Sequence, residues 1–471
     1  MELEGIDIDR TLKELEESLA LENGLSPTLK SLISILILVV KLLTNRLGLN
    51  SQNSSKPPAS DPNRLKTTRK ASGNNPGGQP GHLGTTLKQI DEPDEIEVIE
   101  IDRRKLPRGH YKDVGFETRQ VFDIYIARNV IEYQAQILED ENGVRFVASF
   151  PEGIDKAVQY GKSLKAHAVY MSQYQLLPYN RVQEYFTEQL QIPISQGSLF
   201  NFNKEAFEKL EAFSDVAKNK LSHSSRVHAD ETGININGKR CWLHCASNDL
   251  WTDFFPHQKR GCEAMNERGI LPQFKGVLCH DHWKPYYRYV ACLHALCNAH
   301  HLRELTRAHE QDEQEWAGKM KAFLEEINNA VHDAGGYLDQ VSAEDALKRY
   351  RGLLTQAEVE CPPPDKNKPT GKRGRIKRSK ARNLLERLIN FEADVLRFMV
   401  DADVPFTNNQ GERDIRMTKV QQKISGCFRS MEGAETFCRI RGYLSTCRKH
   451  GVSSSLAMEL LFEGMLPDFI K

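Results

Sequence analysis

Three acidic residues, far apart in the chain, have the type and placement that can hold divalent metal ions. Asp230 lies inside a strand-like run, Asp281 ends a short apolar run, and Glu412 falls in the first turn of a predicted helix. Hard cations such as Mg²⁺ prefer oxygen ligands and keep some of their waters. Two such ions about 3.5–4 Å apart can activate an attacking oxygen and stabilise a leaving one. If folding brings the three carboxylates together, the chemistry that they support is phosphoryl transfer.

Each carboxylate also has an ordinary structural role open to it. Asp230 could serve a turn or pair with Arg226, and Asp281 could cap the helix that follows it. Glu412 could form a surface ion pair with Arg416, which would stabilise the helix by only about a few tenths of a kcal/mol. Taken one at a time, these roles are as well supported as metal binding, so the order of the surrounding elements has to decide.

The segment around Glu412 reads PFTNNQGERDIRMTKVQQKISG. Thr407 and Gln410 have the spacing of a capping box, which predicts that a helix starts here. Val420 and Ile424 can face a core, while cations recur four, seven and eleven residues after Glu412 and so share its helical face. They form either a solvated stripe or a row of phosphate contacts. The residues expected to contact phosphates are Arg413, Arg416, Lys419 and Lys423.

The region that contains Asp230 predicts a three-stranded antiparallel meander. Asn237-Gly238 is a strong type I′ turn signal between strand-like runs at 226–235 and 239–247, and WTDFFPHQ follows as a third strand. A short helix around CEAMNERG and the run GVLCHDHW complete the order strand, strand, strand, helix, strand. Sites in α/β sheets form at the carboxyl ends of strands, and a late helix that packs back across the sheet could bring Glu412 there. This order is typical of a ribonuclease-H-like fold.

Composition sets broad limits. The chain has 471 residues, a formal net charge of zero and 39% hydrophobic residues, so charge gives no global indication of a nucleic-acid partner. The start, MELEGIDID, does not resemble a signal peptide, and the apolar run at 31–40 is too short to span a bilayer. The ten cysteines contain no C-x-x-C pair. We therefore expect a bacterial cytoplasmic protein without a disulfide framework or a membrane partner.

Two further regions are of the kind that binds DNA. NRVQEYFTEQL, QIP and ISQGSLFNFNKEAFEKL predict two helices joined by a tight turn, with Ser195 capping the second. Many helix pairs share this pattern, so a helix-turn-helix is one of two readings. A basic run spans 366–382, and clustered cations of this kind supply sequence-independent affinity for phosphates, although a solvated loop is the alternative. Its residues expected to contact DNA are Lys372, Arg373, Arg375, Lys377 and Arg378.

Residues 9–48 read as helix with a break near Asn23–Gly24 and Pro27, which fits either a short coiled coil or a helix packed on its own domain. Residues 96–150 alternate in strand fashion and predict a small β module.

The segment from His280 to His301 is rich in histidine and cysteine. The spacing of Cys292, Cys297 and His300 does not match the paired spacing of common zinc sites. Such residues also pack in cores, and core packing is the expectation here. Trp283 could stack on a base, but we expect it in the core as well.

Six stretches in order along the chain carry a resemblance to a known family. They are LNSQNSSKPPASD, NNPGGQPGHLG, VHADETG, GVLCHDHWKPYYRY, HALCNAHHLREL and VPFTNNQGERDIRMTKVQQKISGCFRSMEGAETF. Over nearly its whole length the chain resembles the bacterial insertion sequence 66 family of DDE transposases. The resemblance implies that Asp230, Asp281 and Glu412 are the catalytic and metal-binding triad. It also implies a helical insertion before Glu412, where LRELTRAHEQDEQEWAGKMKAFLEEINNAV and SKARNLLERLINFEADVLRFMV read as helices.

The expected fold class is therefore α/β: a ribonuclease-H-like mixed-sheet catalytic core with a helical insertion, plus N-terminal helical or coiled-coil and small β modules. The expected segments are an N-terminal helical segment (1–50), a basic flexible linker (51–90), a small β module (91–155), a helical, helix-turn-helix-like region (156–222), the first part of the core (223–300), the helical insertion with its basic loop (301–400) and the last part of the core with the Glu412 helix (401–471).

The resemblance also sets expectations for cofactors and partners. It implies Mg²⁺ or Mn²⁺, element ends and target DNA as partners, a homo-oligomer on paired ends, and accessory transposition proteins. Family members usually carry a zinc finger with two cysteine pairs before the catalytic part. Residues 91–155 contain no cysteine and only His110 as a ligand, so no structural zinc is expected.

The function expected is a DNA transposase that cleaves element ends and joins them to target DNA by hydrolysis and transesterification with two metal ions. Two alternatives stay open: a catalytically inactive DNA-binding relative or repressor, and a ribonuclease-H-type or junction nuclease.

Overall fold

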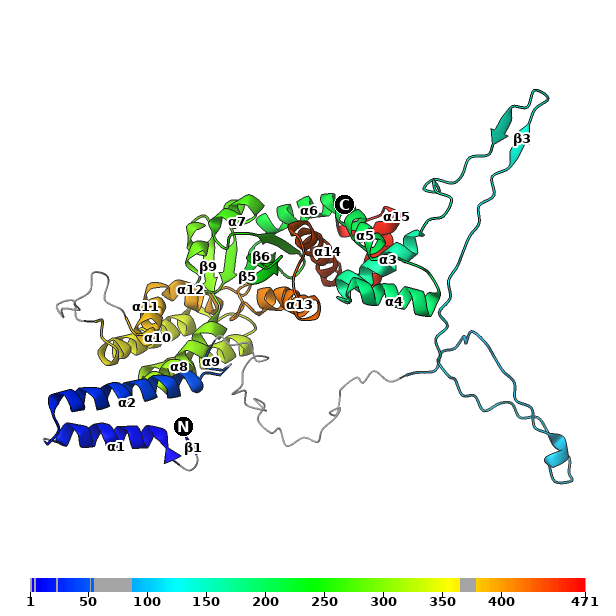
Figure 1. Cartoon of the computed structure of the whole chain (residues 1–471). Coiled ribbons are helices and arrows are strands. Elements are labelled where there is room, and N and C mark those ends of the chain that lie inside the picture. Colours follow the sequence, from blue (N-terminus) through cyan, green and yellow to red (C-terminus); the bar gives the residue numbers. More distant parts are fainter. Residues whose placement is uncertain are drawn as a thin grey trace.

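A five-stranded mixed sheet lies at the centre of the protein (Figure 1). The computed structural model describes residues 2–3, 6–22, 24–50, 52–54, 87–364 and 378–470. The strand order is β7-β6-β5-β8-β9; the first three strands are antiparallel, and β8 and β9 run parallel to β5. The strands are β5 (Arg226–Ile236), β6 (Lys239–Ser247), β7 (Thr252–His257), β8 (Val277–His280) and β9 (Leu293–Leu296).

The meander predicted around Asp230 is confirmed. The turn between β5 and β6 has left-handed φ angles of 48° at Asn237 and 78° at Gly238, as a type I′ turn requires. The predicted third strand is β7, the predicted helix is α7 (Cys262–Arg268), and the apolar run before Asp281 is β8. The sequence analysis did not predict β9.

Strands β5 and β8 separate early, and this split positions the candidate site. Their parallel pairing covers only Arg226–His228 and Val277–Cys279. Beyond the split, β5 has no neighbouring strand on this side among the described residues. Its backbone carbonyls there accept hydrogen bonds from α13 (Asn409–Ser425) and from residues that flank this helix. These contacts are Asn408 Nδ2 to the Ala229 carbonyl, Lys419 Nζ to Gly233 and the Phe428 N–H to Asn235.

The two faces of the sheet pack against different partners because strand side chains alternate. On one face, Ile234 and Leu243 share a buried cluster with Ile415 of α13 and Phe437 of α14 (Met431–Lys449). Figure 1 shows α13 and α14 beside β5 and β6. On the other face, Ala229 and Ala246 join a cluster with Met265 of α7.

The predicted helical insertion is confirmed as a helical body beside β8 and β9 (Figure 1). Its helices are α8 (Asn298–Asp312), α9 (Glu315–Asp333), α10 (Gln340–Glu360), α11 (Lys380–Asn390) and α12 (Glu392–Leu396). Val277 and Ala295 of the sheet share its core with the fully buried Trp316 of α9. The insertion is therefore joined to the strand that ends before Asp281.

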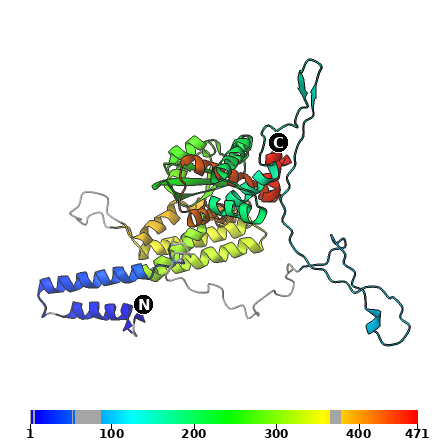
Figure 2. The ribbon, with the colours of Figure 1, turned by 45° about the vertical axis from the view of Figure 1, so that its right-hand side comes forward.

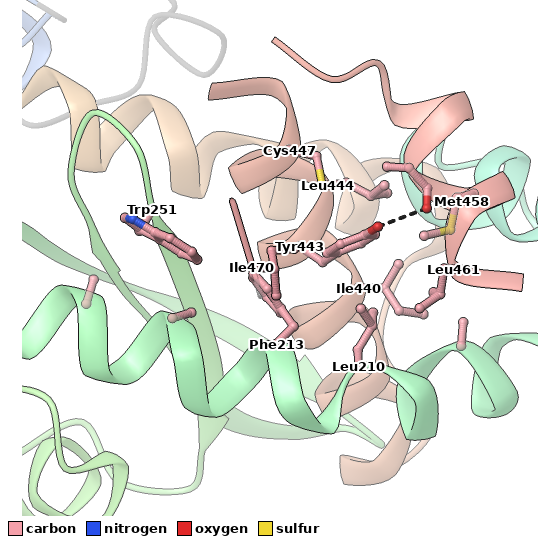
Figure 3. Packing of buried hydrophobic residues seen from close by; sticks show 14 of the residues in the cluster. Leu210, Phe213, Trp251, Ile440, Tyr443, Leu444, Cys447, Met458, Leu461 and Ile470 are labelled. Atoms are coloured by element: carbon pink, nitrogen blue, oxygen red, sulfur yellow. Dashed lines mark hydrogen bonds between the residues drawn. The ribbon is translucent and has the colours of Figure 1, made fainter. Parts of the chain in front are cut away.

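A second helical group packs around the C-terminal helices, as Figure 3 shows for Phe213, Tyr443 and Leu461. The Tyr443 hydroxyl donates to the Ala457 carbonyl at 2.9 Å (Figure 3). The group contains α3 (Lys162–Val169), a π-helix (Tyr170–Tyr174), α4 (Tyr179–Leu190), α5 (Gln196–Lys209), α6 (Glu211–Ser222) and α15 (Ser454–Glu463). Ser195 caps α5 as predicted, since its Oγ accepts the Ser198 N–H at 3.0 Å.

The N-terminal helices form a hairpin at one end of the molecule (Figures 1 and 2). A short strand pair, β1 (Glu2–Leu3) and β2 (Ile6–Asp7), leads into α1 (Ile8–Leu21), and α2 (Pro27–Leu47) starts after the expected break. Among the described residues, α2 is the one helix that is long and apolar enough to cross a membrane, judged by length and composition alone. The sequence analysis considered only its apolar centre, which is shorter than the helix.

The β module predicted for residues 96–150 is largely wrong. The chain from 87 to 160 runs as a long extended loop away from the helices and the sheet (Figures 1 and 2). Its only strands are β3 (Ile137–Glu139) and β4 (Arg145–Val147), which pair with each other and are exposed throughout. The alternating apolar side chains have no apolar surface to pack on here, and an isolated two-stranded hairpin of this size is only marginally stable.

Short 3₁₀ helices complete the fold at Arg103–Lys105, Leu271–Gln273, Lys284–Arg288, Arg397–Met399 and Asp468–Ile470.

Candidate active site

Asp230 lies on β5 two residues past the end of the β5–β8 pairing. It sits directly opposite Cys245 of β6, on the strand face that α13 covers. Its carboxylate accepts the Glu231 backbone N–H at 2.9 Å and forms no ion pair with a described lysine or arginine. Burial, together with the negative charges of Glu231, Asp281 and Glu412, raises the pKa of Asp230 to about 8. This carboxyl group therefore keeps its proton at neutral pH unless a cation is bound.

Asp281 follows directly after β8, so it lies at the other side of the split. Its Oδ1 accepts the Trp283 backbone N–H at 2.9 Å. Burial raises the pKa of Asp281, while the hydrogen bond from Trp283 and the charges of Arg260 and Arg387 lower it. Like Asp230, it forms no ion pair with a described lysine or arginine, so its negative charge is incompletely balanced.

Glu412 is in the first turn of α13, as predicted, but the expected capping box does not form. The N-cap is Asn408, and its side chain makes no capping hydrogen bond. Instead, Asn408 Nδ2 donates to the Ala229 carbonyl at 2.9 Å, and Asn408 Oδ1 lies 2.7 Å from His228 Nδ1. The Asn408 side chain therefore bonds to β5 instead of capping α13. This contact holds the start of α13 against the residue that precedes Asp230.

Gly411 lies where the start of α13 packs against β5. A Cβ at this position would lie 3.3 Å from Asn408 Oδ1 and 3.5 Å from the His228 Cβ. A side chain here would crowd the Asn408 amide that bonds to β5, whereas its contact with His228 would be an ordinary one. Glu412 is the next residue.

Glu412 also has two neighbours that were not expected there. Its Oε1 lies 3.8 Å from His300 Nδ1 and 3.9 Å from Cys297 Sγ, both at the start of α8. In the described part of the chain, these three residues are the one group of potential metal ligands whose atoms all lie within 4.8 Å of one another. Asp230, Asp281 and Glu412 do not form such a group. In the sequence, the C-x-x-H spacing of Cys297 and His300 was the one signal that these two residues could act together.

A second carboxylate beside Asp230, missed in the sequence analysis, is fully engaged by the protein. The Glu231 side chain is 2% exposed, and its Oε1 accepts hydrogen bonds from Arg260 Nη2 at 2.6 Å and from Nε at 2.9 Å. Its Oε2 accepts the Tyr286 hydroxyl at 2.5 Å. Burial raises the pKa of Glu231, whereas these two partners lower it. Glu231 is therefore a structural anchor, and Asp230 remains the carboxylate with no cationic partner.

The donor set fits a hard divalent cation. Asp281 and Glu412 lie close enough to Asp230 for their charges to raise its pKa, and none of the three carboxylates has a lysine or arginine partner within the part of the chain that the structure describes. Buried like charges of this kind are unfavourable by themselves and become favourable around a metal ion.

Comparison with known families finds two matching profiles. A profile of the transposase IS66 family matches residues 157–436, more than half of the chain. The chain belongs to the transposase IS66 family. A second profile, for a family of unknown function (DUF6444), matches residues 8–88. None of the curated proteins compared with this transposase matches it.

The cations expected to contact DNA lie along the Glu412 helix of the transposase. Arg413, Arg416 and Lys423 are exposed and form no ion pair with described residues, so the alternative Glu412–Arg416 pair does not form. Lys419 donates to the Gly233 carbonyl at 2.8 Å, and burial lowers its pKa. Val420 packs on the core as expected, but Ile424 is 43% exposed because it lies in the last turn, past the sheet.

The basic loop of the insertion lies mostly outside the described residues, including Lys372, Arg373, Arg375 and Lys377. Arg378 is described, and its guanidinium group bonds to Glu386 of α11. That contact occupies one of the Arg378 donors that DNA would otherwise use.

Proposed function

We propose that this transposase cleaves DNA strands at the ends of a mobile element and joins them to target DNA at the split between β5 and β8. Asp230, Asp281 and Glu412 are the proposed holders of Mg²⁺ or Mn²⁺. The observation that carries the proposal is the Asp230 carboxyl group, which pairs with no described lysine or arginine and whose pKa is raised to about 8 by burial and by the charges of Glu231, Asp281 and Glu412. Strongly perturbed carboxylates that cluster in this way are typical of functional sites.

The strand order supports a ribonuclease-H-like core. The antiparallel strands β5, β6 and β7, then helix α7, then the parallel strand β8 follow the chain order that the sequence analysis expected of that fold, and β9 adds a fifth strand that was not expected. The first carboxylate lies in the first strand of the sheet, the second follows the fourth strand, and the third is on a helix packed across the sheet. The helical insertion separates the second from the third.

The chemistry divides between the bound ions and the side chains. The ions, when bound, supply Lewis-acid activation of the attacking oxygen and neutralise charge at phosphorus. Asp230 must lose its proton when a cation is bound, because a liganding carboxylate is ionised. Asn408 holds Glu412 against β5, and the exposed cations of α13 neutralise phosphates that flank the reacting one.

Two successive reactions are proposed at this site. In the first, water attacks a phosphorus at the element end, the bond to the 3′ oxygen breaks, and that oxygen leaves as a 3′-hydroxyl after gaining a proton. In the second, this hydroxyl attacks a phosphorus of the target, and the target's own 3′ oxygen leaves. The partners are thus element ends and target DNA, with the transposase working as a homo-oligomer on paired ends, together with accessory proteins.

The test is strand cleavage by an Asp230→Asn variant on a supercoiled plasmid that carries both element ends, with Mg²⁺ present. We expect nicking to be lost while a gel shift on the same DNA is retained. Asp333→Asn is the matched control, because that carboxylate is 82% exposed at the end of α9. Undiminished nicking by Asp230→Asn would refute the assignment.

The same pair of assays separates the alternatives. A protein that only binds DNA shifts the plasmid fragment but never nicks it, whether or not Asp230 is present. A ribonuclease-H-type nuclease cleaves RNA–DNA hybrids without regard to the element ends.

A further inference from the structure

Four side chains beside the candidate site alternate between arginine and tryptophan. The Arg240 and Arg260 guanidinium carbons each lie 4.7 Å from the ring centre of Trp242, and Arg260 also lies 4.4 Å from that of Trp283. We call Arg240, Trp242, Arg260 and Trp283 the arginine–tryptophan ladder. Each guanidinium group is attracted to the electron-rich face of the ring beneath it. The three contacts together hold the guanidinium groups in fixed places.

One end of the ladder is tied to the candidate site. Trp283 donates its backbone N–H to Asp281, and Arg260 bonds to Glu231, the neighbour of Asp230. The other end lies on the hairpin of β5 and β6, where Trp242 pairs with Gly233. The ladder therefore sets a fixed spacing between Arg240 and the acidic residues. Trp283 packs against the core, as expected, but it is only partly buried, as is Trp242.

The two arginines differ in what their donors do. Arg260 uses Nε and Nη2 to bind Glu231. Arg240 is exposed and forms no hydrogen bond or ion pair with any described residue. A guanidinium group that stacks through its face keeps the N–H groups of its edge free, and their planar arrangement matches a phosphate. Arg240 is thus a pre-positioned donor with no acceptor in the described protein.

Gly233 makes room for this arrangement. A Cβ at Gly233 would lie 3.2 Å from both Nε and Nη2 of Arg240. A side chain at position 233 would therefore push the Arg240 guanidinium group away from its place over β5 by a few tenths of an ångström. Lys419 is close enough for the charge of Arg240 to lower its pKa, in addition to the effect of burial. The two cations at this spot are not balanced by a described carboxylate, so the local charge favours an anion.

We propose that the ladder is a phosphate-binding site for the DNA strand that carries the cleaved bond. Arg240 donates to a backbone phosphate, while Trp242, Arg260 and Trp283 hold it at a set distance from Asp230 and Asp281. This assignment rests on the proposed function only for the identity of the strand. Binding of a DNA phosphate by Arg240 can be measured without any cleavage.

The experiment measures DNA affinity against salt concentration without divalent ions, so that no cleavage occurs. Each neutralised phosphate contributes about 0.9 to the slope of log K against log salt concentration on duplex DNA. We expect Arg240→Ala to lower that slope by about one and to weaken binding about tenfold at moderate salt. Trp242→Leu and Gly233→Ala keep every charge but disturb the position of Arg240, and we expect them to lower the slope by less than Arg240→Ala does.

The matched control is Arg349→Ala. Arg349 also lies over an aromatic ring, 5.3 Å from the centre of Phe323, but Glu326 occupies its donors and it belongs to α10 of the insertion. An unchanged slope in Arg240→Ala, or an equal drop in Arg349→Ala, would overturn the proposal. Loss of cleavage in Asp230→Asn tests the active site separately. The salt dependence of binding thus tests the phosphate site at Arg240, and the cleavage assay tests the metal site at Asp230. Either proposal can fail while the other holds.

Discussion

The two faces of strand β5 surround a buried carboxyl group in opposite ways. Glu231 points to the face of α7, where Arg260 and Tyr286 take up both of its oxygens. Asp230, one residue earlier, points to the face of α13 and receives only a backbone N–H. Both carboxyl groups have a raised pKa because of burial, but only Glu231 has side-chain partners that lower it.

The difference distinguishes a structural carboxylate from one that is poised for a ligand. A buried charge that has partners in the protein, as Glu231 has, is compatible with the fold as long as those partners are in place. Removing the charge leaves the partners without their hydrogen bonds and ion pair. A buried charge without a partner destabilises the fold and is retained where an outside cation completes it. On this basis Glu231 belongs to the scaffold and Asp230 to the reaction.

The largest expected effect separates these two roles by activity. Asp281→Asn should slow Mg²⁺-dependent strand cleavage by at least about 10³-fold, because a metal ligand contributes several kcal/mol to lowering the barrier. Glu231→Gln should keep cleavage within about tenfold at a temperature where it stays folded. Rates of plasmid nicking measure both variants. Equal losses would mean that Glu231 is also a ligand.

The next largest effect is on stability, where changing Glu231 should cost more than changing Asp230. Glu231→Gln should lower the free energy of unfolding by about 1–3 kcal/mol, since it leaves Arg260 and Tyr286 with a weaker acceptor. The loss stays below that of a fully buried ion pair because the Arg260 side chain is 39% exposed. Asp230→Asn should leave stability unchanged or raise it. Urea unfolding of the metal-free proteins gives both values, and a stability loss in Asp230→Asn as large as that in Glu231→Gln would contradict the comparison.

A third effect is the pH dependence of stability in the metal-free protein. The pKa of Asp230 rises from 3.8 to about 8 on folding, so between these values the folded state binds more protons than the unfolded state. Stability should therefore fall as the pH rises from about 4 to about 8. The fall should be smaller in Asp230→Asn and in wild type with Mg²⁺. Unfolding curves across this pH range provide the test, and an identical pH profile in Asp230→Asn would show that other groups set it.

The smallest effect isolates one partner of Glu231. Tyr286→Phe removes the hydroxyl that donates to Oε2 and should cost about 1 kcal/mol of stability. Cleavage should be nearly unchanged, because Arg260 still holds Glu231. Thermal unfolding together with the nicking assay would reveal a different outcome, in which the hydroxyl serves the reaction rather than the fold.

The sequence predicted the strands around Asp230 well, for physical reasons. Alternating side chains and the Asn237-Gly238 turn are local signals, and β5, β6 and β7 follow them. The same alternation failed at 96–150, because a strand needs a neighbour to pair with and a surface to pack on, neither of which local sequence reports. Strand β9 was missed because it has only four residues and lies between a 3₁₀ helix and α8.

The candidate site was predictable only in part. Asp230 and Asp281 could be placed because each belongs to a strand whose order in the sheet follows from its pattern. The contacts of Glu231 with Arg260 and Tyr286 join residues 29 and 55 positions apart, and no local pattern signals such pairs. Cys297 and His300 meet Glu412 only because α8 and α13 start side by side. The wrong capping box at Thr407 has the same origin, since Asn408 bonds to β5 instead.

The most direct measurement is an anomalous-scattering map from crystals of the wild-type transposase grown with Mn²⁺. A peak in contact with carboxylate oxygens of Asp230 and Asp281, with Glu412 completing the site, is the expected result. A map without a peak at Asp230, or with density only between Cys297, His300 and Glu412, would contradict the assignment of Asp230 as a metal ligand.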